Sequence, residues 1–257
     1  MYSLILNTNA EFLKTRRTNA IWLTIAGALF IPSVNFIKLL SRPDLFVPQT
    51  KADPWAFMLN DNWAPGASLF LPIYVILVIS LVAQIEFTNN TWKQVYASPR
   101  RYADIYFSKL FVILFLILLW IVLLSIFMMA SGYVVEMVNS DYVFTGRQVP
   151  WRQLSTIAMK MFASTLGIVA IQYWLSLWFK SFVTPIGIGM ALLTGGLMIR
   201  QWEYISYYPY LHPLLVYFPN PGLEEGTADK TILNSIVESA IVLGLGFYHM
   251  CIKKEKG

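Results

Sequence analysis

Six apolar segments constrain the fold of this chain more than any other feature. They cover residues 20–37, 67–85, 105–129, 157–179, 182–199 and 232–251. The hydrocarbon core of a bilayer is about 30 Å thick, so a helix that rises about 1.5 Å per residue needs about 20 apolar residues to cross it. The segments therefore predict an all-α integral membrane protein with six transmembrane helices.

The composition agrees with a chain whose solvent is the bilayer. Hydrophobic residues make up 57% of the 257 residues and charged residues only 13%, whereas soluble domains carry roughly 25% charge. We therefore expect residues 1–257 to form a single transmembrane domain. One cysteine, Cys251, cannot form an intramolecular disulfide, and no Cys/His pair has zinc-ligand spacing. The sequence predicts no metal site, no cofactor and no catalytic residues in this chain.

The fourth and fifth apolar segments are separated only by a few residues around Lys180 and Ser181. One long helix is the alternative to two, but Pro185 and the nearby glycines favour a break. Within the fifth segment Gly187, Ala191 and Gly195 recur every four residues, a spacing that allows close helix contact.

Basic residues are distributed unevenly between the two predicted sides of the membrane. With the N-terminus inside, the cytoplasmic side holds 11 basic and 4 acidic residues, a net of +7. The other side holds 8 basic and 10 acidic residues, a net of −2. This positive-inside bias predicts a multi-pass protein with both termini in the cytoplasm. It also explains the overall charge of +5 without nucleic-acid binding.

The residues before the first apolar segment have the pattern of an amphipathic helix. Tyr2, Ile5 and Phe12 follow the spacing of one helical face. We expect residues 1–19 to form a helix in the inner membrane interface. A positively charged topogenic flank is the alternative. The candidate functional residues of this helix are four charged residues at its C-terminal end and one aromatic residue among them: Glu11, Phe12, Lys14, Arg16 and Arg17.

The connection between the second and third apolar segments carries two helix-start signals. Thr88, Asn89 or Asn90 can cap a short helix that extends through Ala97. Ser98 followed by Pro99 then marks a second start. These signals predict a short cytoplasmic helix that lies across the membrane surface, followed by a new transmembrane helix. A solvated connector whose arginines only fix the topology is the alternative.

Residues 86–110 resemble the coupling segment of ABC-2 type permeases. The shared features are an acidic residue at the end of the second span, a Thr-Trp-Lys-Gln helix, a Ser-Pro turn and Ser108-Lys109-Leu110 at the start of the third span. The likeness is greatest to the permeases of bacitracin-resistance and lantibiotic-immunity transporters. The residues that this resemblance assigns to ATPase coupling are Glu86, Thr91, Trp92, Lys93, Gln94, Tyr96, Arg100 and Arg101.

The resemblance implies a permease subunit of the bacterial inner membrane. It implies a separate ABC ATPase that holds ATP and Mg, because this chain has no Gly-x-x-x-x-Gly-Lys-Ser/Thr phosphate loop. It further implies export of an amphipathic peptide, antibiotic or lipid, and thus a role in antibiotic resistance. The expected partners are the ATPase, a second copy or a homologous permease, and membrane lipids.

Polar residues within the sixth apolar segment form a further candidate site. Asn234, Ser235, Glu238 and Ser239 share one helical face. Ionisable residues at membrane depth face protein or water, so this face fits a translocation path or a dimer seam. The alternative is a span that begins later and leaves Glu238 near the headgroups. His212 has no second histidine nearby and is interpreted as structural.

Two other classes of protein share some of these features. An intramembrane protease or lipid-modifying enzyme would need a catalytic constellation. Glu224 and Glu225 lie outside the spans, and no Gly-x-Ser-Gly motif occurs. An accessory membrane subunit without its own transport role is the second alternative.

Overall fold

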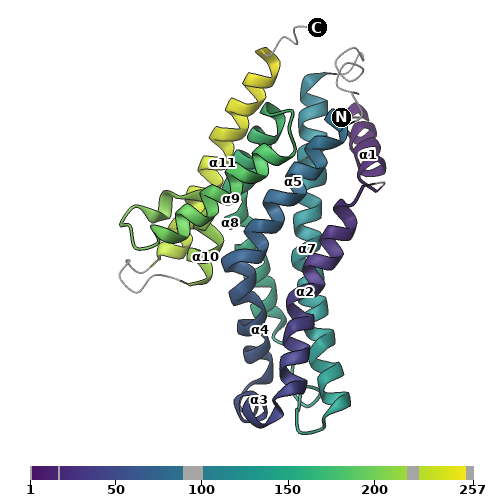
Figure 1. The fold of residues 1–257 in the computed structure, drawn as a ribbon, viewed down its shortest axis with the longest axis vertical. Helices are drawn as coiled ribbons and strands as arrows, with labels where there is room; N and C mark the ends of the chain where they lie inside the picture. Colours follow the sequence, from purple (N-terminus) through teal and green to yellow (C-terminus); the bar gives the residue numbers. More distant parts are fainter. Residues whose placement is uncertain (1, 17, 89–100, 219–225, 253–257) are drawn as a thin grey trace.

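The computed structural model describes residues 2–16, 18–88, 101–218 and 226–252. Within these residues the protein is built from helices and contains no β-strand, which confirms the predicted all-α class. Figure 1 shows a long group of helices that includes α2, α5 and α7, beside a second group that includes α9, α10 and α11.

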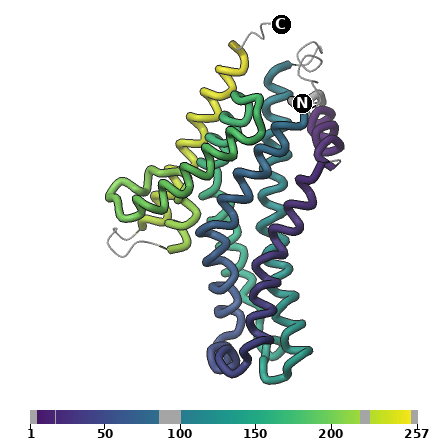
Figure 2. The backbone as a smooth tube through the Cα atoms, in the orientation of Figure 1, coloured from purple at the N-terminus to yellow at the C-terminus, as the bar shows by residue number. Residues whose placement is uncertain are grey.

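The first group is formed by the N-terminal half of the chain. It contains α1 (Tyr2–Arg16), α2 (Ala20–Ser41), α5 (Leu71–Thr88) and α7 (Tyr102–Val138). Between α2 and α5 lie α3 (Pro43–Thr50), α4 (Pro54–Pro65) and a π-helical turn, Gly66–Phe70, that joins α4 to α5. The trace in Figure 2 shows that α1 lies beside the same end of the bundle at which α5 ends and α7 begins.

The second group is formed by the C-terminal half. It contains α8 (Trp151–Trp178), α9 (Val183–Met198), the 3₁₀ turns Ile205–Tyr207 and Pro209–Leu211, α10 (His212–Tyr217) and α11 (Thr227–Ile252). Helices α8 and α11 pack along one another, and α8 also contacts α5 and α10. The core of the molecule is therefore continuous across the two groups.

Five helical stretches are long and apolar enough to cross a membrane. They are Ala20–Ser41, Pro54–Ile85, Tyr102–Val138, Trp151–Trp178 and Thr227–Ile252. Helix α9 is equally apolar but has only 16 residues, which corresponds to about 24 Å. The chain is thus a multi-pass membrane protein.

The helices extend beyond the predicted apolar segments. Helix α7 has 37 residues, about 55 Å, where the apolar segment covered only residues 105–129. The stretch between the first and second predicted spans, residues 38–66, contains two helices that the apolar segments do not predict, α3 and α4. Pro43 and Pro54 occupy the first helical turns, and the Asp53 side chain caps α4 by accepting from Ala56 N at 3.0 Å.

A small aromatic core holds the far end of this long group together. The rings of Trp55 and Phe144 lie 5.1 Å apart, and Tyr133 packs against the other side of Trp55. Lys38 on α2 binds both carboxylate oxygens of Asp61 on α4 at 2.6 Å. These contacts hold α2, α4 and the second half of α7 together at this end of the group.

Helices α8 and α9 are separated by a real break, as Pro185 predicts. Helix α8 ends at Trp178 and α9 begins at Val183. Gln172 on α8 joins the two helices, since its Nε2 donates to Pro185 O at 2.8 Å. The side chain of Gln172 also accepts from Tyr210 Oη at 3.0 Å. A buried polar side chain with satisfied partners fixes the position of α9 against α8 and the 3₁₀ turn Pro209–Leu211.

Candidate coupling site

Most of the predicted coupling segment lies outside the described residues. This applies to Thr91, Trp92, Lys93, Gln94, Tyr96 and Arg100. Glu86 belongs to the last turns of α5, and Arg101 is the exposed residue directly before α7. The structure therefore defines the two helix ends to which the segment is attached, the end of α5 and the start of α7. The contacts of the first turns of α7 show which helices the segment could influence.

Lys109 on α7 forms a buried ion pair with Glu11 on α1. Its Nζ lies 3.0 Å from Glu11 Oε2, and the two side chains are 1% and 6% exposed. The same Nζ donates to Val82 O on α5 at 3.5 Å. This ammonium group therefore ties α7 to both α1 and α5, two turns after α7 begins.

The electrostatics of this pair favour the charged state of Glu11. Burial by itself raises the pKa of the Glu11 carboxyl, but the ammonium groups of Lys109 and Lys14 outweigh burial and hold that pKa below its ordinary value. Lys14 is itself paired with Glu11 across one helical turn. The carboxylate thus accepts from a residue of its own helix and from α7.

Tyr106 connects the same part of α7 to the second group of helices. Its Oη donates to Leu243 O on α11 at 3.0 Å, and its backbone oxygen accepts from Tyr173 Oη on α8 at 2.9 Å. A Cβ on Gly246 would lie 3.0 Å from Tyr106 Oη, so the glycine makes room for this contact. The first two turns of α7, residues 102–109, are called its base here. Through Tyr106 and Lys109 the base contacts α1, α5, α8 and α11.

The remaining α1 residues predicted from the sequence lie around this contact. The Phe12 ring packs edge-on against Phe115 of α7, with 5.0 Å between centroids. Arg16 is exposed, and Arg17 lies outside the described residues. Tyr106 and Tyr173 were not singled out from the sequence, because buried tyrosines in apolar segments have no distinguishing spacing.

The predicted polar face of α11 is divided between two neighbours. Ser235 Oγ donates toward Ala163 O and Ser164 O of α8, and it accepts from Gly167 N at 3.0 Å. Asn234 Nδ2 donates to Ser206 O at 2.9 Å. The Ser239 hydroxyl donates within α11, to Ile236 O.

Glu238 faces His212 of α10. The His212 side chain is fully buried. Glu238 Oε2 lies 3.9 Å from His212 Nε2, while that Nε2 donates to Ser206 O at 3.1 Å. Glu238 Oε2 and His212 Nδ1 are buried and have no hydrogen-bond partner in the part of the chain that the structure describes. The two residues thus form a pair that the sequence interpretation of His212 as purely structural did not anticipate.

These features define a helical, multi-pass membrane protein in which the base of α7 joins the two groups of helices. A family model described as ABC-2 family transporter protein matches residues 8–196. The chain belongs to the ABC-2 family, whose members are membrane permeases of ABC transporters. A search of curated proteins found no match, and no solved structure matches the chain. The expected likeness to bacitracin and lantibiotic permeases stays a prediction.

Proposed function

We propose that this chain is the permease subunit of an ATP-driven exporter in the bacterial inner membrane, and that it moves an amphipathic peptide, antibiotic or lipid outward. ATP and Mg are held by a separate ATPase subunit. The observation that carries the proposal is the base of α7, which follows the coupling segment directly and contacts four other helices through Lys109 and Tyr106.

Mechanical coupling follows from this arrangement. A displacement of residues 86–101 moves the end of α5 or the start of α7, because the segment joins these two helices. Lys109 transmits that displacement to α1, and Tyr106 transmits it to α8 and α11. Buried, paired polar groups resist separation, so the helices move as connected bodies.

Trp92 is the residue we propose as the anchor for the ATPase. Aromatic residues flanked by polar groups form interface hot spots whose truncation can cost about 2 kcal/mol or more. Trp92→Ala should reduce permease-stimulated ATP hydrolysis by the reconstituted complex about tenfold or more, while the permease still inserts. The matched control is Trp22→Ala on α2, a tryptophan that is 72% exposed and does not belong to the segment. Equal rates of ATP hydrolysis with wild type, Trp92→Ala and Trp22→Ala would show that Trp92 has no role in coupling.

The proposed topology has six membrane helices, with α9 as a short fifth one and both termini in the cytoplasm. Positive-inside charge supports this orientation. Cysteines introduced at Lys93 and Lys254 in a Cys251→Ser background should stay protected from an impermeant reagent in intact cells. Labelling of either introduced cysteine from outside the cell would contradict the proposed topology.

A second permease completes the proposed transporter. The apolar window of α11 is only 22% buried within this chain, the lowest share among the five candidate spans. Leu233, Val237 and Ile241 form an exposed apolar stripe on it. A homodimer or a pair with a homologous permease would cover such a stripe, and lipid would cover it in a single copy.

Glu238 is the proposed polar contact of the translocation path or dimer seam. Its carboxyl group borders the exposed stripe of α11 and meets no basic side chain among the described residues other than His212. Glu238→Gln should lower transport severalfold and leave assembly intact, because it keeps the shape and removes the charge. Ser235→Ala, which removes hydrogen bonds on the same helix, is the structural control. Unchanged transport in Glu238→Leu would show that Glu238 has no such role.

A further inference from the structure

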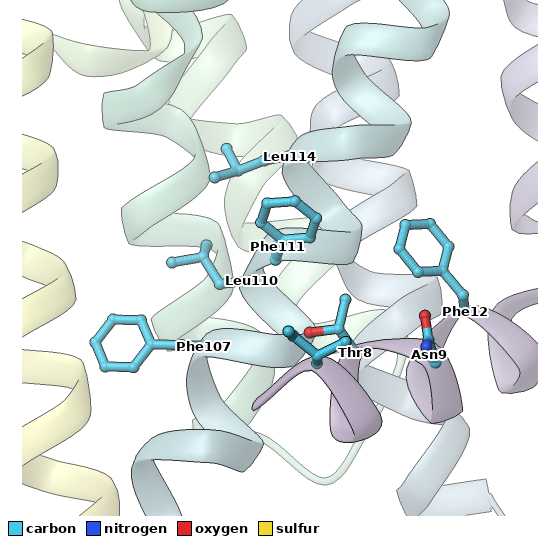
Figure 3. Close-up of a pocket in the computed structure, with 8 residues that line it drawn as sticks. Thr8, Asn9, Phe12, Phe107, Leu110, Phe111 and Leu114 are labelled. Carbon is cyan, nitrogen blue, oxygen red and sulfur yellow. The ribbon is translucent and has the colours of Figure 1, made fainter. Parts of the chain in front are cut away.

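A groove of about 520 Å³ lies between α1 and α7. Its lining residues are Ile5, Thr8, Asn9, Phe12, Phe107, Leu110, Phe111 and Leu114. Figure 3 shows Thr8 and Asn9 on the α1 side, while Phe107, Leu110, Phe111 and Leu114 follow one another along α7. The groove is thus mainly apolar, and its two polar residues, Thr8 and Asn9, lie on α1 between Ile5 and Phe12.

The groove opens toward the surroundings of the protein. Ile5 and Phe111 are 59% and 58% exposed, and Phe107 is also exposed. Helix α7 crosses the membrane here, whereas α1 packs across its first turns. An amphipathic molecule aligned with the bilayer would therefore have its polar part level with α1 and its chain along α7.

Charge points to the same occupant. Thr8, Phe12 and Arg16 follow one another at four-residue spacing along one stripe of α1, and Asn9 lies beside this stripe. Arg16 does not itself line the groove. Arg16 is exposed one turn beyond Phe12. Guanidinium and hydroxyl groups are the ordinary protein partners of a phosphate group.

We propose that the groove binds one phospholipid of the adjoining leaflet, with an acyl chain against Phe107, Phe111 and Leu114 and its phosphate near Thr8, Asn9 and Arg16. A phospholipid has both parts that the groove offers to bind, an apolar chain and an anionic head. A free fatty acid also has both, but its head is a carboxylate and it has one chain, so the test must separate the two.

The bound lipid would sit directly beside the ion pair that joins α1 to α7. Phe12 and Leu110 of the groove are the chain neighbours of Glu11 and Lys109. A chain wedged between the two helices fills space that neither helix fills and so holds α1 against α7. Lipid occupancy is therefore expected to stabilise the α1–α7 contact. Any effect on ATP hydrolysis rests on the proposed coupling function, whereas the binding itself does not.

Photo-crosslinking of the purified full-length chain tests the binding alone. The probe is a phospholipid with a diazirine on its acyl chain, and a diazirine fatty acid is the comparison. We expect the phospholipid to label peptides from residues 5–12 or 107–114, and excess unlabelled phospholipid to suppress this labelling. Leu114→Trp, which fills the groove, should lower labelling severalfold, whereas Leu118→Trp one turn further along α7 should not.

Two further measurements keep the proposal falsifiable. Arg16→Gln should weaken competition by unlabelled phospholipid without changing competition by a neutral diacylglycerol, which has the chains but no anionic head. Thermal unfolding of each variant shows whether it is folded. Equal labelling along all of α7, unchanged in Leu114→Trp, would overturn the lipid site. Competition by fatty acid as strong as by phospholipid would overturn the phosphate contact.

Discussion

At the scale of single residues, the Glu11–Lys109 pair is the most deeply buried of the ion pairs described here. Both side chains are almost fully buried. Removal of one member takes a close countercharge from a buried charge, whereas replacement of both by apolar groups is often neutral. The pair is thus expected to matter for how α1 is positioned more than for net stability.

Glu11→Leu and Lys109→Met should each destabilise the protein by about 3–5 kcal/mol, and the double variant should recover most of this loss. Thermal unfolding in detergent measures all three. The control pair is Lys160 and Asp229, which lie 3.4 Å apart and are 43% and 78% exposed. Lys160→Met should cost less than about 1 kcal/mol. Additive losses in the double variant would show that Glu11 and Lys109 do not interact.

The pH dependence of this pair has a definite sign. Because the pKa of Glu11 is lower in the folded protein than its ordinary value of 4.5, the unfolded chain binds a proton first as the pH falls. The contribution of the pair is complete above pH 4.5 and is lost as the pH falls from there through the folded pKa. The difference in melting temperature between wild type and Glu11→Leu should therefore be constant above pH 4.5 and shrink as the pH falls below it. A difference that does not shrink below pH 4.5 would contradict the assignment.

At the scale of elements, the small residues of α9 correctly indicated close packing, but the predicted face of the helix differs from the face that packs in the structure. The repeat of Gly187, Ala191 and Gly195 suggested the contact face. In the structure, a Cβ on Gly187 or Gly195 would meet nothing within 4 Å among the described residues. The close contacts belong to Gly189 and Gly196. A Cβ on Gly189 would lie 2.6 Å from Gln172 Oε1 and 3.0 Å from Ile76.

Gly189→Ala should therefore destabilise the protein, because Gln172 and Ile76 would have to move. Gly187→Ala, two residues away on the same helix, should be neutral or stabilising by about 0.5–1 kcal/mol in the isolated subunit. Melting temperatures of the two variants provide the comparison. If Gly187→Ala is the more damaging of the two, α9 packs through its other face.

The sequence predicted the class of fold because the span signal depends only on length and polarity. It predicted the break before α9 because Pro185 acts locally. It missed α3 and α4, because their start signals, Pro43 and the Asp53 cap followed by Pro54, are local and were not singled out. It also missed the partnership of Lys109 with Glu11 and of His212 with Glu238, since residues 98 and 26 positions apart in the chain meet only through tertiary packing.

At the scale of the whole molecule, α7 joins the two helix groups at the end next to the proposed coupling segment. It contacts α2, α1, α5, α8 and α11. A rigid helix of about 55 Å can carry a displacement at its first turns to the aromatic core around Trp55 at its other end. This arrangement supports the proposal that a separate ATPase drives the permease.

The central claim is that this chain works through a separate ATPase, and co-purification tests it most directly. The tagged chain is extracted from its native membrane in mild detergent, and the proteins that remain bound are identified. We predict that a polypeptide with a Gly-x-x-x-x-Gly-Lys-Ser/Thr phosphate loop co-purifies in a fixed ratio and is lost in Trp92→Ala. A chain that purifies in active form without any such ATPase would contradict the claim.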